Sequence, residues 1–206
     1  MALRSVKQSG LGGFTKYRSL RLATFPSTMG MVLITPTSIA HAGTSASIGT
    51  NGQVTFTAVT SLSLNGVFSA TYDNYVVSIR SVHSTADYYL DAKLRASGTD
   101  ASGSNYTYQN LVANSTTVSG ARFTSQTSAV FGYTANTQRS GETIAIYGPY
   151  LAQPTAWRTV NVLGRDSGII ADFACTHSLS TAYDGFTISV SAGNVTGTLQ
   201  VYGVRS

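Results

Sequence analysis

The stretch FSATYDNYVVSIRSV, residues 68–82, places three aromatic residues around a turn and then continues as an alternating strand. The Asp-Asn pair at 73–74 favours a chain reversal, because both side chains bond readily to nearby backbone. Beyond the turn, side chains two residues apart point to the same side of a strand. Tyr75, Val77 and Ile79 are therefore predicted to line one face, with polar neighbours on the other. We expect the aromatic residues before the turn to cover one end of the sheet.

The same alternation recurs along the rest of the chain. Short apolar-polar runs are separated by clusters of Gly, Asn, Asp and Ser, which is typical of antiparallel strands joined by tight turns. No segment of useful length has the 3.6-residue period of a helix. The predicted strands are QVTFTAV (53–59), SLSLNGVF (61–68), YVVSIRSV (75–82), YYLDAKLRA (88–96), NYTYQNLV (105–112), AVFGY (129–133), ETIAIYG (142–148), WRTVNVLG (157–164), IIADFACTH (169–177), FTISVS (186–191) and TGTLQVYGV (196–204).

The composition agrees with a protein made of strands. Charged residues make up only 10% of the 206 residues, against about 25% in an average soluble domain. A solvated helix usually carries pairs of Glu and Lys, whereas Ser and Thr suit the surface of a sheet. The number of strands favours a jelly-roll-like arrangement over a seven-strand sheet pair. We therefore predict an all-β fold, a jelly-roll-like antiparallel β-sandwich with an extended N-terminal arm.

The net charge of +5 comes from the N-terminal segment. No acidic residue precedes Asp73, and the remaining eight basic residues equal the eight acidic ones. We predict two parts, a basic N-terminal anchoring arm over 1–43 and a β-sandwich domain over 44–206. No basic face continues into the sandwich, which disfavours nucleic acid and favours docking onto a partner protein or neighbouring subunit. The partner-binding residues of the arm are predicted to be Arg4, Lys7, Lys16, Arg18 and Arg21.

Several functional classes have little support in the sequence. The longest apolar run, 29–34, is far shorter than the roughly 20 residues of a membrane-spanning helix. A secretion signal is disfavoured as well, because this run is short and Pro36 interrupts the segment that follows it. The single cysteine, Cys175, lies in an alternating run and is interpreted as a buried apolar residue. The nucleotide-binding, zinc-protease and serine-hydrolase motifs are missing, and carboxylates are few. We predict no catalytic residues, no cofactor and no metal site, and hence no enzyme.

Twelve tyrosines and one tryptophan are the main binding resource of the chain. Tyrosine offers a large contact area with a hydrogen-bonding tip, so Tyr106, Tyr108 and Trp157 are candidates for contact with a sugar or a protein. The polar segments 96–105 and 113–120 are predicted to be exposed loops beside them. The alternative remains that strand tyrosines fill the sandwich core or a subunit interface.

FSATYDNYVVSIRSV (68–82), IAIYGP (144–149), AYDGFTISV (182–190) and the terminal TGTLQVYGVR (196–205), taken in this order, resemble a widespread set of tailed-bacteriophage virion proteins. In those proteins a segment of the type s-L-n-g-v-F-s-x-x-Y-d-n-Y opens the domain, and a strand of the type tG-t-x-x-v-YG-x-r closes it. The resemblance covers about residues 60–206. It implies a jelly-roll-like β-sandwich in a phage particle without catalytic residues.

From this resemblance we expect a structural component of the virion, located in the tail rather than the capsid. The chain would act as a tail fibre or adaptor protein that binds other virion proteins and assembles as a symmetric homo-oligomer, a trimer. Two alternatives stay open, a capsid decoration protein and a carbohydrate-binding module that recognises a glycan on the host surface. A surface with few ions suits tight subunit packing, because few charges must lose their water at the interface.

Overall fold

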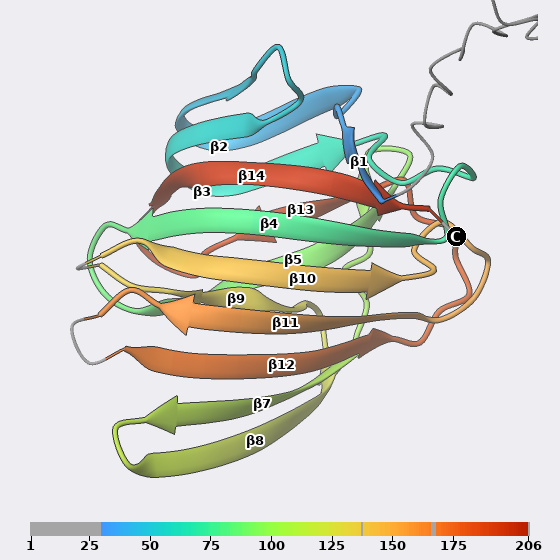
Figure 1. Ribbon diagram of the computed structural model, residues 1–206. Coiled ribbons are helices and arrows are strands. Elements are labelled where there is room, and N and C mark those ends of the chain that lie inside the picture. Colours follow the sequence, from blue (N-terminus) through green and yellow to red (C-terminus); the bar gives the residue numbers. More distant parts are fainter. Residues whose placement is uncertain (1–29, 137, 166–167, 206) are drawn as a thin grey trace, which may run out of the picture.

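The computed structural model describes residues 30–136, 138–165 and 168–205. These residues form fourteen strands that belong to one antiparallel sheet (Figure 1), and the prediction of an all-β fold is confirmed. The strands are β1 (Met31–Ile34), β2 (Ser38–Ile48), β3 (Val54–Asn65), β4 (Asn74–His83), β5 (Tyr88–Ala96), β6 (Thr99–Asp100), β7 (Tyr106–Asn114), β8 (Thr117–Gln126), β9 (Ala129–Thr134), β10 (Ser140–Tyr147), β11 (Thr155–Leu163), β12 (Ile169–His177), β13 (Gly185–Ser189) and β14 (Val195–Val204).

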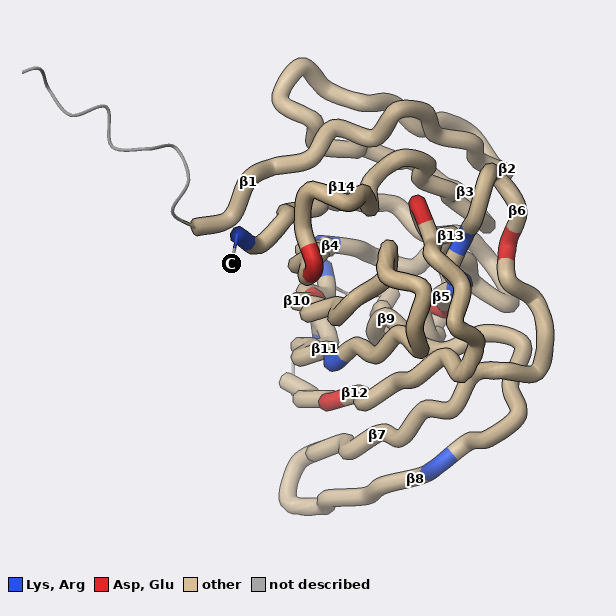
Figure 2. Tube along the Cα trace, turned by 90° about the vertical axis from the view of Figure 1, so that its right-hand side faces the viewer, with Lys and Arg blue, Asp and Glu red and all other residues tan. Residues whose placement is uncertain are grey.

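The sheet curls over itself into a half-barrel with two facing layers. Its strand order is β6-β5-β13-β3-β14-β4-β10-β11-β12-β7-β8, with β1 beside β14, β2 beside β3, and β9 beside β5. The strands from β14 to β8 form the broad layer seen from outside in Figure 1, whereas β5, β9 and β13 lie behind it. Figure 2 shows the same curl from the side, with few and scattered charged residues. This is the jelly-roll-like sandwich that the strand pattern predicts.

Strand β3 joins the two layers by bending in its middle. Its first half pairs with β14, and its second half, Ser61–Leu64, pairs with β13. At the bend Ala58 has a positive φ of 47°, and its N–H donates to the hydroxyl of Thr196 at 2.9 Å instead of continuing the ladder. An interrupted register of this kind bends a strand and increases its twist. The runs 53–59 and 61–68, predicted as two strands, are thus one strand with a bulge.

The core lies between the layers and is rich in aromatic rings. Phe131 of β9 is 5.8 Å from the ring of Trp157 of β11 and 5.1 Å from that of Phe186 of β13. Both contacts have the edge-to-face geometry that aromatic pairs favour. Because β9 lies inside the curl, its residues from Ala129 to Gly132 are buried on both faces.

The stretch 68–82 behaves as its alternation predicts. Tyr75, Val77 and Ile79 are buried on the inner face of β4, and the Phe68 ring packs 4.7 Å from that of Tyr75. The hydroxyl of Tyr75 accepts a hydrogen bond from the Ser69 N–H at 2.7 Å and donates to the Ser69 carbonyl at 2.9 Å. One phenol therefore holds the loop that precedes its own strand and closes this end of the half-barrel.

Tyr75→Phe is expected to lower the free energy of unfolding by about 1–3 kcal/mol, because it leaves two backbone groups of Ser69 without their partner. Urea unfolding measures this loss. The matched control is Tyr147→Phe, since Tyr147 is half exposed at the end of β10, and its effect should stay within about 0.5 kcal/mol. Equal losses in the two variants would show that the hydroxyl of Tyr75 does not hold the loop.

The beginning of the sheet lies earlier in the chain than residue 44. Strand β1 pairs with β14 through Met31–Ile34, and β2 pairs with β3 over nearly its whole length. The predicted boundary at residue 43 therefore falls inside β2, and residues 31–43 belong to the sheet. The five basic residues of the predicted arm lie outside the described residues. Segment 113–120 also differs from its prediction as a loop, because it contains the turn between β7 and β8 and the start of β8.

Candidate functional site

The aromatic residues predicted to form a contact surface lie in the core, which corrects that prediction. Tyr106 is fully buried, and its hydroxyl accepts from the N–H of Leu94 at 3.0 Å and donates to the carbonyl of Ala101 at 2.9 Å. Trp157 is 2% exposed and donates its indole N–H to the Val130 carbonyl at 3.1 Å. Tyr108, 9% exposed, stacks on another ring. All three occupy inward positions of their strands, and the bonds of Tyr106 to Leu94 of β5 and of Trp157 to Val130 of β9 join the two layers.

A histidine and a cysteine of β12 are also part of this interior. His177 lies 3.2 Å from the hydroxyl of Tyr183, and burial lowers the pKa of its imidazole. Burial raises the pKa of the Cys175 thiol to about 12, so this thiol stays protonated and is a poor nucleophile. In the described part of the chain no group of three or more His, Cys, Asp or Glu side chains is placed to hold a metal ion.

Glu142 is a carboxylic acid in an apolar interior. It is 2% exposed on β10. Its side chain packs directly against Gly132, since a Cβ added to that glycine would lie only 2.3 Å from the Glu142 Cγ. Ser81 Oγ is 3.3 Å from one carboxyl oxygen, and the other oxygen has no partner among the described residues. Burial raises the pKa of Glu142 well above its ordinary value of 4.5. Such shifts mark functional sites in some proteins, but this carboxyl does not line the pocket described below.

Glu142 gives the protein a pH-dependent stability. Its pKa is raised in the folded state, so the unfolded chain loses this proton first as the pH increases above about 4.5, and the free energy of unfolding falls. Burial acts in the same direction on Asp91, whose pKa rises to about 6. The lowered pKa of His177 acts in the opposite direction below about pH 6.5. We therefore compare two proteins, and expect the urea midpoint of the wild type to fall relative to that of Glu142→Gln as the pH increases from about 4.5 to about 7. Identical slopes would contradict a raised pKa at Glu142.

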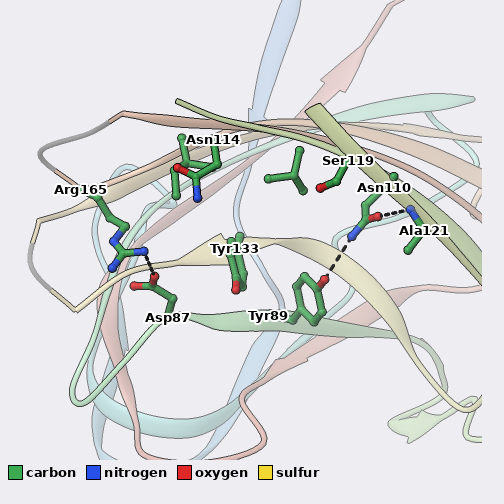
Figure 3. A pocket seen from close by; sticks show the side chains of 11 residues that line it. Asp87, Tyr89, Asn110, Asn114, Ser119, Ala121, Tyr133 and Arg165 are labelled. Atoms are coloured by element: carbon green, nitrogen blue, oxygen red, sulfur yellow. Dashed lines mark hydrogen bonds and ion pairs between the residues drawn. The ribbon is translucent and has the colours of Figure 1, made fainter. Parts of the chain in front are cut away.

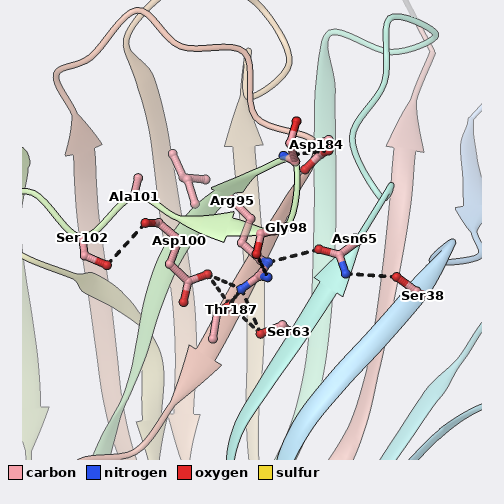
Figure 4. Close-up of polar contacts among 12 residues, drawn as sticks. Ser38, Ser63, Asn65, Arg95, Gly98, Asp100, Ala101, Ser102, Asp184 and Thr187 are labelled. Carbon is pink, nitrogen blue, oxygen red and sulfur yellow. Dashed lines mark hydrogen bonds and ion pairs between the residues drawn. The ribbon is translucent and has the colours of Figure 1, made fainter.

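At the other end of β5, polar side chains form a network of hydrogen bonds with one another (Figure 4). The guanidinium of Arg95 pairs with Asp100 of β6 and donates to Thr187 Oγ1 at 2.9 Å and to Asn65 Oδ1 at 3.1 Å. It also donates to Ser63 Oγ at 3.1 Å. These bonds connect β3, β5, β6 and β13. Since the donors of Arg95 are occupied, we interpret the network as a structural clamp.

The candidate functional site is a pocket between the two layers, at the side where the half-barrel is open (Figure 3). Its volume is about 420 Å³. The walls come from β5, β7, β8, β9 and β12, with contributions from the segments before β5 and after β11. The lining residues are Asp87, Tyr89, Asn110, Val112, Asn114, Ser119, Gly120, Ala121, Tyr133, Arg165 and Ile169.

Bonds to the surrounding strands position the polar groups of this pocket. Asn110 Oδ1 accepts from the backbone N–H of Ala121 at 2.8 Å, and its amide nitrogen donates to the hydroxyl of Tyr89 at 3.1 Å. Arg165 forms an ion pair with Asp87 Oδ2 at 2.9 Å. The ring of Tyr89 packs 4.9 Å from that of Tyr133, and burial raises the pKa of the Tyr133 hydroxyl. Figure 3 shows these side chains around a common opening.

Two long edge strands form a second kind of candidate site. Strand β2 pairs with β3 and β8 pairs with β7, and neither has a further strand partner among residues described here. Both are exposed over most of their length, on both faces. Together they contain one residue of the Asp, Glu, Lys and Arg group, Arg122, and no proline.

The outer face of the broad layer is apolar near its centre. Val160, Val162 and Ile170 are neighbours on β11 and β12 and are more than half exposed, as is Leu111 on β7. The charges beside them, Arg158 and Asp172, form an ion pair with each other. The charges at the centre of this face therefore cancel each other.

Comparison with known proteins adds little to this description. No known protein family and no curated protein matches the chain. Among solved structures, a protein of unknown function, SO2946 from Shewanella oneidensis MR-1, is 8% identical and matches with a TM-score of 0.26, over 85% of this chain and 80% of its own. A likeness at this level carries no argument about function. In the part of the chain that the structure describes, no helix is long and apolar enough to cross a membrane.

Proposed function

We propose that this chain is a structural component of a tailed-phage particle, a tail fibre or adaptor protein that assembles as a symmetric homo-oligomer. The observation that carries the proposal is the pair of long edges formed by β2 and β8, which together carry a single residue of the Asp, Glu, Lys and Arg group. The resemblance of residues 60–206 to virion proteins gives the class of particle. The edges supply the physical reason for assembly.

An open edge presents unpaired N–H and C=O groups to any other strand. Proteins that remain monomeric usually protect such edges with charges, proline, bulges or short strands. Strand β8 has ten residues and its single charge is Arg122, whereas β2 has eleven residues and none of Asp, Glu, Lys or Arg. The register shift of β8 lies near its end and leaves 117–123 regular, whereas the shift of β2 at Ala42/Gly43 divides it into two shorter regular stretches. We infer that neighbouring subunits cover these edges.

The position of the edges favours a ring. Strands β2 and β8 lie at opposite sides of the molecule in Figure 1 and differ in sequence. Joining β8 of one subunit to β2 of the next is a head-to-tail contact, which forms a closed ring when the rotation is right. A trimer is the ring that we propose. The apolar outer face of β11 and β12 would then remain available for other virion proteins.

Replacing edge residues with lysine is expected to dissociate the oligomer. Val118 of β8 and Ser45 of β2 are exposed, so Val118→Lys and Ser45→Lys introduce charge at the edges without changing the core. Light scattering after size-exclusion chromatography should give a trimer for the full-length wild type and a monomer for the double variant. Ser180→Lys, on an exposed loop, is the control and should remain trimeric. A wild-type protein that is monomeric at all concentrations would reject this assembly.

The basic N-terminal segment is proposed to anchor the oligomer in the particle, through Arg4, Lys7, Lys16, Arg18 and Arg21. Deletion of residues 1–29 should abolish incorporation into virions while the circular dichroism of the sheet stays unchanged, because the described sheet begins at Met31. A variant with the five basic residues replaced by serine should show the same loss if charge is the cause. Labelling of purified particles by electron microscopy distinguishes tail from capsid. Normal incorporation of both variants would contradict the anchoring role.

A further inference from the structure

We propose that the pocket lined by Asp87, Tyr89, Asn110 and Tyr133 binds a neutral saccharide unit. The inference is independent of the assembly proposed above, since it depends only on groups within one subunit. It concerns residues different from the buried Tyr106, Tyr108 and Trp157.

The shape of the pocket suits a small ligand. Its volume of about 420 Å³ falls in the range of roughly 300–1,000 Å³ typical of small-molecule sites. Residues of both layers form its walls, with Tyr89 and Tyr133 on one side and Asn110 and Asn114 on the other. The hollows on the outer face differ, because side chains of a single layer line them, as around Val160 and Ile170. A ligand in the pocket between the layers would therefore contact side chains of both layers.

The hydrogen-bonding groups of the pocket match hydroxyl groups. Asp87 Oδ1 is buried and has no partner among the described residues, while Oδ2 is held by Arg165. Neither oxygen is therefore open to a ligand, and Asp87 acts on the pocket by positioning Arg165 in its wall. The hydroxyl of Tyr89 accepts from Asn110, which leaves its proton available for donation. Sugar hydroxyls both donate and accept, so they can use the donor at Tyr89 together with the exposed amide of Asn114 and hydroxyl of Ser119.

The apolar part of the pocket and its charge narrow the ligand class. The rings of Tyr89 and Tyr133, together with Val112 and Ile169, provide the hydrophobic lining that a C–H face of a sugar ring would contact. The charges of Asp87 and Arg165 cancel, and the carboxylate disfavours a second anion nearby. The apolar lining and the absence of a net positive charge among the described lining residues together favour a neutral hexose or N-acetylhexosamine over phosphate or an acidic sugar.

The test uses the full-length protein with methyl glycosides of glucose, galactose, N-acetylglucosamine and rhamnose. Saturation-transfer NMR should detect at least one of them, with a Kd near about 1 mM. Asn114→Trp fills the pocket from an exposed position at the end of β7 and should weaken binding by at least about tenfold. Asp87→Asn should also weaken it, because it removes the ion pair that positions Arg165 in the pocket wall. Ser180→Trp, on an exposed loop outside the pocket, is the matched control and should bind as the wild type does.

Melting curves verify that each variant is folded before its binding is compared. The proposal is overturned if the wild type shows no saturation transfer to any of the four glycosides and captures no neutral glycan on an array. Unchanged binding in folded Asn114→Trp would equally reject this pocket as the site, and capture of acidic glycans alone would reject the ligand class. Light scattering on the same samples measures assembly separately, so a failure here does not affect the proposed oligomer.

Discussion

The bend of strand β3 at Ala58 is the constraint on which the rest of the structure depends. One half of this strand belongs to the broad layer beside β14, and the other half belongs to the inner layer beside β13. The layers therefore need no separate connection at this edge, and the apolar faces of both halves point to one interior. Gly43 on β2 lies opposite the bend, where a Cβ would be 2.2 Å from the Ala58 carbonyl oxygen. The bulge thus requires a glycine on the neighbouring strand.

The sequence predicts the strands that face this interior, because burial of one face imposes alternation. In β11 and β12 every second residue is buried, and both runs were predicted close to their observed bounds. Strands β2 and β8 have no such signal. They are exposed on both faces, so small polar residues occupy inward and outward positions alike. This explains why the beginning of the sheet was placed after residue 43 and why 113–120 was predicted as a loop.

The candidate site was less accessible to prediction than the fold. The sequence shows many tyrosines, but their number does not say which of them are exposed. An alternating strand places each aromatic residue inside or outside according to its register, and Tyr106 and Trp157 both lie inside. The pocket residues come from segments that are far apart in the chain, such as Asp87 and Arg165. Only the curl of the sheet brings them together. Asn110 could have been noticed, since it is a polar residue at an inward position of β7, between Tyr108 and Val112.

The exposed edge β8 and the pocket are consequences of the same geometry. Because the inner layer ends at β9, it does not extend under the hairpin of β7 and β8, and Thr117–Arg122 are exposed on both faces. Beneath the hairpin, partly exposed side chains such as Tyr89 and Tyr133 line the pocket between the layers. A neighbouring subunit that added a strand to β8 would extend the broad layer along its hydrogen-bonding direction. Ser119, Gly120 and Ala121 of the same strand line the pocket, so an assembly through β8 would place the neighbouring subunit next to the pocket wall.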